Sequence, residues 1–259
     1  MFLLLNLVFF QSIGIHNTTP QDSLAIWLQA VRTNQNLSTK QKGVYLESAI
    51  QGLKNSNPAA LSSISAAALQ SGDSTLFRKY NKRVIQLTAK LGESKAHAFA
   101  HWDMADFLKV TIPDSAFYHY REAYTIFSEM DLDETSNHYP GNLLIAIGQL
   151  QDNIKDYVGA EKSHINAIQY FEKIGRQDKL YVAYNGLGIA QNGMKKFDRA
   201  IEYYNKARLY IPEMPSKEQY RAFRSLDNNI ASAYLRKGDF NTSFALYTQL
   251  KERDGLMES

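Results

Sequence analysis

Residues 181–214, YVAYNGLGIAQNGMKKFDRAIEYYNKARLYIPEM, carry the pattern that decides the fold. Small residues stand at Gly188 and Ala200, with aromatic side chains at helical spacings around them. Two antiparallel helices approach closely where a side chain at their contact is small, and larger side chains fill the seam beside it. The stretch therefore predicts a pair of packed antiparallel helices. The residues assigned to this packing are Tyr184, Leu187, Gly188, Ala200, Tyr204 and Ala207, with Pro212 ending the second helix.

The same pattern recurs along the chain. A copy toward the C-terminus has Tyr234, Gly238 and Tyr247 at matching steps, and an upstream copy has Gly148 and Ala160, with a histidine in the aromatic position. Self-similarity at a period of roughly 20–50 residues indicates a solenoid of stacked repeats. The equivalent positions, 39, 44, 40 and 43 residues apart, are Ser65, Met104, Gly148, Gly188 and Ala231.

These steps predict an all-α solenoid of five to six helix-turn-helix repeats, each about 40 residues long. Ser38 and Gln41 form a candidate capping box, and Pro58 is a candidate first residue of a helix. No strand alternation is visible, so we expect one continuous domain from about residue 22. The predicted boundaries are 22–57 for a divergent helix pair, 58–96 and 97–140 for weaker repeats, and 141–180, 181–223 and 224–259 for clear repeats.

Over nearly its whole length the sequence resembles the tetratricopeptide repeat (TPR) family. More narrowly, residues 87–93 (LTAKLGE) and 113–118 (PDSAFY) look like the extracytoplasmic sensor regions of bacterial TPR-containing histidine kinases. The resemblance implies a protein- or peptide-binding module of a two-component system, in which a transmembrane helix, a coiled coil and a kinase core follow the repeats. Any kinase activity and any membrane tether would then lie beyond Ser259. The alternative is a stand-alone TPR scaffold or adaptor in an envelope or cytoplasmic complex, without a signalling output.

The resemblance also implies where a partner binds, because the first helices of TPR repeats line a concave groove. Asparagine and glutamine amides both donate and accept hydrogen bonds, which suits an extended peptide. No Lys/Arg cluster that would clamp an acidic tail is visible in this row. The residues assigned to the groove are Asn142, Ile145, Gln149, Asn153, Asn185, Ile189, Asn192, Asn228, Ser232 and Arg236.

The N-terminus resembles a secretory signal. Residues 2–10, FLLLNLVFF, form an apolar run that is too short to span a bilayer, and small residues follow up to Gly14. No Lys or Arg precedes the run, so a buried N-terminal helix is the alternative. We expect residues 1–14 to direct export to the periplasm, and the alternative is a cytoplasmic chain.

Composition and motifs argue against catalysis. The chain has no cysteine, which excludes disulfides, thiol nucleophiles and cysteine-ligated metals. The net charge of +3 is spread along the sequence, so a nucleic-acid-binding surface is not expected. His97 and His101 have helical spacing but no third ligand, and we expect both to lie on the surface. We therefore predict no enzyme activity, no metal and no cofactor; the oligomeric state stays open.

Overall fold

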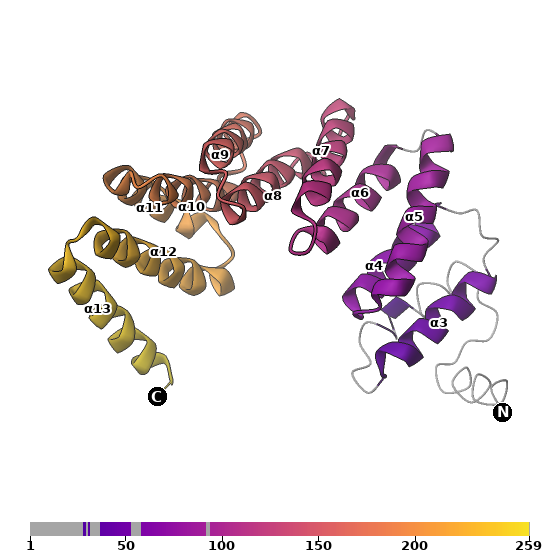
Figure 1. The fold of residues 1–259 in the computed structure, drawn as a ribbon, viewed down its shortest axis with the longest axis horizontal. Helices are drawn as coiled ribbons and strands as arrows, with labels where there is room; N and C mark the ends of the chain where they lie inside the picture. The colour runs from indigo at the N-terminus through magenta and orange to yellow at the C-terminus, as the bar shows by residue number, and fades with distance from the viewer. Residues whose placement is uncertain (1–27, 30, 32–36, 53–57, 92–93, 259) are drawn as a thin grey trace. The chain divides into compact units, whose positions relative to one another are not determined.

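Figure 1 shows the computed structural model, which describes residues 28–29, 31, 37–52, 58–91 and 94–258. Every regular element within these ranges is a helix, so the predicted all-α class is confirmed. The chain divides into two compact units, residues 1–107 and 108–259. This differs from the single continuous domain expected from the sequence, and the boundary divides the repeat predicted for 97–140. Unit 1 buries one of the described apolar clusters and unit 2 buries two.

Unit 1 has four helices with described bounds. They are α3 (Thr39–Gly52), α4 (Pro58–Gln70), α5 (Ser74–Leu91) and α6 (Ser94–Leu108), whose last residue belongs to unit 2. The Ser38 backbone N–H donates to Gln41 Oε1 at 2.9 Å, and the Gln41 N–H donates to Ser38 Oγ at 3.3 Å, so the predicted capping box is confirmed. Pro58 is the first residue of α4, also as predicted.

The core of unit 1 forms where α4 packs against α5. Alanine and serine make up much of α4, which allows the bulky Phe77 and Val84 of α5 to pack closely against Ile64. The Asn81 side-chain amide of α5 donates to the Ala100 carbonyl of α6 at 3.0 Å. A buried amide needs such a partner, and this bond joins α5 to α6.

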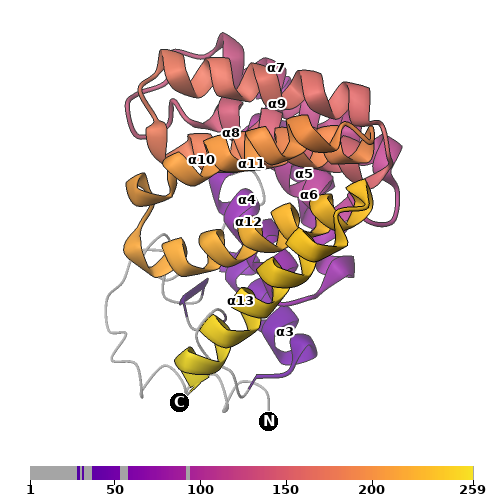
Figure 2. The same ribbon diagram turned by 90° about the vertical axis from the view of Figure 1, so that its left-hand side faces the viewer.

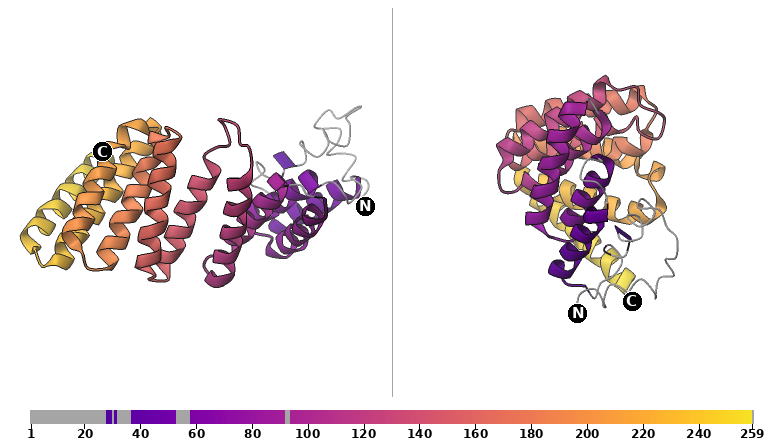
Figure 3. Two further views of the ribbon diagram at one scale, coloured as in Figure 1. Left: turned by 90° about the horizontal axis from the view of Figure 1, so that it is seen from above. Right: turned by 90° about the vertical axis from the view of Figure 1, so that its right-hand side faces the viewer.

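Unit 2 is a row of antiparallel helices that stand side by side (Figure 3). They are α7 (Pro113–Glu129), α8 (Tyr139–Asn153), α9 (Tyr157–Lys173), α10 (Gln177–Gly193), α11 (Phe197–Leu209), the 3₁₀ turn η1 (Ile211–Glu213), α12 (Ser216–Lys237) and α13 (Phe240–Glu258). Three repeats follow one another as α8/α9, α10/α11 and α12/α13. We call α8, α10 and α12 the first helices and α9, α11 and α13 the second helices. Each first helix also contacts the first helix of the next repeat.

The turn inside each repeat has one recurrent geometry. Lys155, Lys195 and Gly238 occupy the same step of the three repeats of unit 2, and their φ angles are 65°, 62° and 92°. The Lys195 N–H donates to the Asn192 carbonyl at 3.1 Å, and the Lys196 N–H donates to the Gln191 carbonyl at 2.9 Å. This pair of bonds ends a helix through one left-handed residue. The repeat spacing read from the sequence therefore matches a physical turn.

Close helix approach occurs at the predicted small residues. A Cβ atom on Gly188 would lie 2.4 Å from the Tyr204 ring, and one on Gly148 would lie 2.5 Å from the His164 ring. Only glycine leaves room for a ring at these points. Ala160 and Ala200 are fully buried on the facing helices. The structure therefore places these small residues where the two helices of a repeat come closest.

The remaining packing residues also lie within or beside the seams. Leu187 and Ala207 are buried, Tyr184 stacks on Tyr210, and Tyr234 packs partly buried against the last apolar cluster. Tyr247 departs from this pattern with 37% of its surface exposed. Pro212 lies in η1, just after α11 ends, as expected for a residue that cannot continue a helix.

Two predicted segments lie outside the described residues, namely the apolar N-terminal stretch 1–14 and most of the first helix of the divergent pair at 22–57. Within the described ranges, none of the helices combines the length and the hydropathy required to cross a bilayer.

Candidate functional site

The ten predicted groove residues all lie on the first helices of unit 2, but their accessibility differs. The exposed ones are Gln149, Asn153, Ile189, Asn228 and Arg236, and the partly buried ones are Asn142, Asn185, Asn192 and Ser232. The remaining residue, Ile145, is only 8% exposed and belongs to an apolar cluster with Leu144 and Phe171. Its side chain is part of the core, so it does not offer a polar or open contact to a partner.

Some polar residues of this row contact side chains outside it. The Asn229 amide N–H₂ donates to the Asn185 side-chain oxygen at 2.9 Å, which joins α10 to α12. The Arg236 guanidinium lies over the Phe197 ring, 5.5 Å from its centroid. These contacts use part of the hydrogen-bonding capacity of the row to hold successive repeats together.

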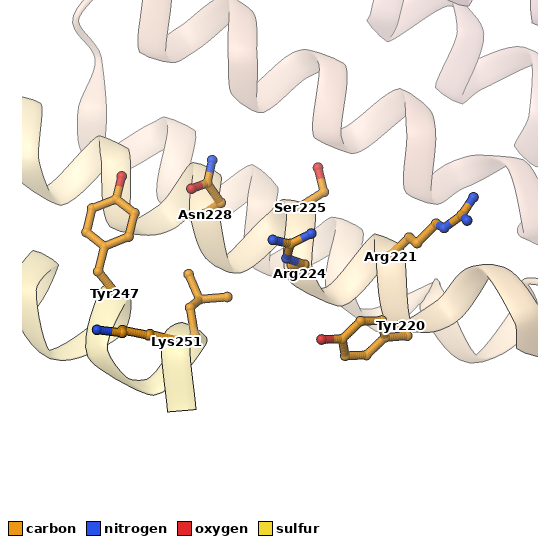
Figure 4. A pocket seen from close by; sticks show the side chains of 8 residues that line it. Tyr220, Arg221, Arg224, Ser225, Asn228, Tyr247 and Lys251 are labelled. Carbon is orange, nitrogen blue, oxygen red and sulfur yellow. The ribbon is translucent and has the colours of Figure 1, made fainter. Parts of the chain in front are cut away.

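A hollow with a volume of about 720 Å³ lies between α12 and α13 (Figure 4). We call it the basic cleft. The residues that line it are Tyr220, Arg221, Arg224, Ser225, Asn228, Tyr247, Leu250 and Lys251. Five come from α12 and three from α13, and the two helices lie next to each other in Figure 2.

The basic cleft carries three cations and, among its described lining residues, no carboxylate. Arg221 and Arg224 are exposed on α12, and Lys251 is exposed on α13. Arginine forks bind carboxylates through paired hydrogen bonds, and tyrosines add apolar area with a polar tip. The sequence prediction of no Lys/Arg cluster concerned the row of groove residues from Asn142 to Arg236, and these three cations are not members of that row.

Repeat equivalence explains how the basic cleft arises. Arg224 occupies the step of Tyr181 in the preceding repeat, where the Tyr181 hydroxyl donates to the Ala222 carbonyl of the next first helix at 3.3 Å. Lys251 occupies the step of Arg208, which forms an ion pair with Asp227 of the next first helix. Both steps therefore face the position of a following helix. In the sequence, the signal for this cleft is a basic residue at each of two repeat positions that face a following helix, Arg224 and Lys251.

The candidate histidine pair on α6 differs from expectation. His101 is 4% exposed, so the prediction of two surface histidines is wrong. The His97 Nδ1 lies 2.7 Å from the Thr88 hydroxyl of α5, and the two imidazole rings make an edge contact. The pair packs α6 onto α5. The described residues include no group of three side chains able to hold a metal ion.

One buried polar pair lies inside unit 2. His164 is fully buried, and its Nε2 atom lies 3.0 Å from Asp152 Oδ2. Burial raises the pKa of the Asp152 carboxyl, and the bond to His164 opposes part of that shift. The equivalent residues of the next repeat are Tyr204 and Asn192, an uncharged pair. The His164–Asp152 pair therefore occupies a packing position of the repeat, away from open solvent.

No protein-family model matches the chain, and no curated protein matches it significantly. Solved structures do match in fold. BtubC from P. vanneervenii is 15% identical, with a TM-score of 0.67 and 94% of each chain covered. A TPR-like kinesin light chain from Podosopora anserina is 12% identical, with a TM-score of 0.64 over 79% of this chain and 98% of that one.

A third similar structure is a signal transduction ATPase with numerous domains from Pyrococcus horikoshii, which carries a tetratricopeptide repeat sensor. It is 15% identical, with a TM-score of 0.69, and the match covers 83% of this chain and 32% of that one. Identities this low establish a shared fold alone. The fold of this chain is that of TPR-like solenoids, as the sequence predicts.

Proposed function

We propose that this chain is a non-catalytic binding module that holds an acidic segment of a partner protein in the basic cleft. The observation that supports this most is three cations and two tyrosines around one hollow with no carboxylate among its described lining. The exposed polar residues of α8, α10 and α12 extend the contact surface along unit 2. Opposite charges at a solvent-exposed site favour association, and salt weakens the attraction between them.

The test is peptide selection on the purified protein. A displayed library of random 12-residue peptides is selected on the wild-type chain, and the enriched sequences are synthesised. We expect enrichment of Asp and Glu, and a loss of affinity of about tenfold in Arg221→Glu, since a charge reversal replaces attraction by repulsion. Lys162→Glu is the matched control, because Lys162 is exposed on α9 outside the cleft. Selection of neutral peptides that bind both variants equally would reject the proposal.

We further propose that this module is the sensory or interaction region of an exported bacterial two-component protein. Its support is the signal-like stretch 2–10 and the likeness of the repeats to those of TPR-containing sensor kinases. The test is fractionation of the native host followed by N-terminal sequencing of the mature protein. A periplasmic chain that begins after Gly14 supports export, whereas a cytosolic chain that retains Met1 favours the scaffold alternative.

A further inference from the structure

The positive charge of the chain is concentrated in unit 1. Residues 1–107 contain ten Lys and Arg against six Asp and Glu, whereas residues 108–259 contain 19 against 20. Five of the ten cations belong to α5, whose 18 residues include no Asp or Glu. A single helix therefore carries half of the basic residues of unit 1.

These five cations share one side of α5, and all of them are exposed. An α-helix turns by about 100° per residue, so the five side chains fall within an arc of about 140°. The opposite side carries Phe77, Tyr80 and Val84, which are buried in the core of unit 1. We call the exposed side the basic face. It consists of Arg78, Lys79, Lys82, Arg83 and Lys90.

The internal repeats show that the helix pair does not require this charge. α5 follows α4 as a second helix follows a first helix, because Ser65 and Asn81 have the 16-residue spacing of Gly188 and Tyr204. The second helices of unit 2 carry exposed glutamates on the equivalent side. At the steps of Lys79, Gln86 and Ala89 these are Glu202 of α11, Glu252 of α13 and Glu172 of α9.

Repulsion replaces attraction at one pair of steps. On α11, the Lys206 ammonium lies 2.9 Å from the carboxylate of Glu202, four residues earlier. The same two steps of α5 hold Lys79 and Arg83. Like charges four residues apart destabilise a helix, whereas an opposite pair stabilises it. The basic face therefore weakens α5, and an anionic surface lying against it would relieve the repulsion.

We propose that the basic face of α5 binds an anionic lipid surface, with the helix lying along the headgroups. The cations extend over about 18 Å, at about 1.5 Å per residue from Arg78 to Lys90. A cluster of about four to eight Lys and Arg on an amphipathic helix is typical of a segment that binds acidic lipids. This surface belongs to unit 1, so the proposal goes beyond the acidic segment held in the basic cleft of unit 2.

The contact with lipid is peripheral. The apolar side of α5 is engaged in the core, where the centroid of the Phe77 ring lies 4.9 Å from that of Phe107 on α6. The folded helix therefore presents only its charged side to a membrane. Binding that depends on exposed charges weakens as salt shortens the range of their attraction.

Two of the five cations also contact rings of their own unit. The Arg78 guanidinium lies 5.0 Å from the centroid of the Phe107 ring, and the Lys79 ammonium lies 5.0 Å from that of Tyr80. These contacts hold both side chains close to the protein surface. Substitutions at Lys82 and Arg83 therefore test the basic face with the least effect on packing.

The exposed side of α5 favours lipid over nucleic acid. Single strands are held largely by stacking their bases on aromatic side chains, but Phe77 and Tyr80 of α5 are buried. The exposed residues between the cations are small or polar, such as Thr75, Gln86 and Ala89. A lipid surface requires no stacking and no base contact, because its charge density attracts the cations directly. Duplex DNA is the competing polyanion in the experiment.

The experiment is cosedimentation of the purified full chain with large vesicles. One set contains equal parts of phosphatidylcholine and phosphatidylglycerol, and the other contains phosphatidylcholine alone. We expect the protein to pellet with the acidic vesicles and to stay in solution with the neutral ones. It should be released at about 1 M NaCl, where the Debye length falls to about 3 Å. Failure to bind acidic vesicles at low salt would overturn the proposal.

Substitutions locate the binding surface. Each cation near an acidic membrane contributes a factor of about five in affinity, so Lys82→Gln with Arg83→Gln should weaken binding about 25-fold. Exchanging these two residues, as Lys82→Arg with Arg83→Lys, keeps the charges and should preserve binding. The matched control, Lys162→Gln with Lys173→Gln, removes the same charge from exposed positions of α9 and should change binding less than about twofold. Circular dichroism checks that each variant is folded.

Equal weakening by the α5 and α9 variants would show that net charge alone causes binding, and it would overturn the assignment to the basic face. Arg221→Glu, which tests the basic cleft, should leave vesicle binding unchanged, and the α5 variant should leave the affinity for the selected acidic peptides unchanged. Loss of vesicle binding in Arg221→Glu alone would place the lipid contact in the basic cleft and overturn the basic face.

A short DNA duplex added to the vesicle-bound protein decides between the two polyanions. Retention on the vesicles at equal concentrations of DNA phosphate and phosphatidylglycerol supports the lipid surface. Release at a lower DNA phosphate concentration, with duplex binding that the α5 variant loses, would show that the basic face prefers nucleic acid and would overturn the lipid surface.

Discussion

Replacement of Lys195 by glycine should stabilise the protein. Lys195 has a φ of 62°, at the step where Gly238 has a φ of 92° in the next repeat. A side chain in the left-handed region costs about 1–2 kcal/mol relative to the right-handed one, whereas glycine adopts it without a Cβ penalty. Glycine also increases the entropy of the unfolded chain, which offsets about 0.5–1 kcal/mol. The expected net gain in the free energy of unfolding is therefore about 0.5–1 kcal/mol.

The assay is urea unfolding followed by far-ultraviolet circular dichroism, with thermal unfolding as a second measure. Lys155 has the same conformation, with a φ of 65°, so Lys155→Gly should give a similar gain. The two turns belong to different repeats, and the double variant should gain about 1–2 kcal/mol if their effects add. A change of 1 kcal/mol corresponds to about 2–4 °C in Tm for a chain of this size.

The control is the same substitution inside a helix. Lys162 is exposed in the middle of α9, where glycine is expected to destabilise by about 1 kcal/mol. Opposite signs at Lys195 and Lys162 would show that the backbone conformation, and not the loss of a lysine, determines the effect. A neutral or destabilising Lys195→Gly would refute the assignment of strain to this turn.

Three further predictions concern the packing of unit 2. Gly188→Ala places a methyl group 2.4 Å from the buried Tyr204 ring and should lower the free energy of unfolding by roughly 1–3 kcal/mol in urea titrations. Ser243→Ala removes the 2.9 Å hydrogen bond from the hydroxyl to the Ala231 carbonyl but introduces the alanine found at this position in the two preceding repeats. We expect the free energy of unfolding to fall by less than about 1 kcal/mol, and a larger loss would contradict the assignment of Ser243 to the same repeat position as those alanines. Burial raises the pKa of Asp152, so its contribution to the free energy of unfolding is most favourable below the unfolded pKa of about 3.9 and falls as the pH rises through the raised pKa. Asp152→Asn should therefore be as stable as the wild type near pH 3.5 and more stable than the wild type at pH 8. Urea unfolding at both pH values is the measurement.

The sequence predicts the seams of unit 2 well because a close helix contact requires a small residue at one particular step. Gly188 and Gly148 each face an aromatic or imidazole ring, and the turn residues recur seven positions later. A histidine in the aromatic position at residue 164 is also explained, since its ring fills the same space as Tyr204. These features depend on local spacing, which a single sequence displays.

Surface features were less predictable, because accessibility depends on which neighbours pack around a side chain. Ile145 shares its step with the more polar Asn185 and Asn228, yet it is buried against α9 and α10. His101 is buried although its spacing suggested an exposed helix face. The cations of the basic cleft come from two helices, and only the turn between them brings Arg224 and Lys251 together.

The ion pairs between α11 and α12 bear on how the chain avoids pairing the wrong repeats. Arg208 meets Asp227 and Lys237 meets Asp198 at that junction, whereas the α9–α10 junction joins Gln191 to Glu161 by a 2.7 Å hydrogen bond. Repeats with the same backbone could otherwise exchange neighbours during folding, because their seams are alike. Since each junction has its own polar partners, a shift of the chain by one whole repeat would leave these charges mismatched. Polar partners that differ from one junction to the next therefore disfavour a shift of the stack by one repeat.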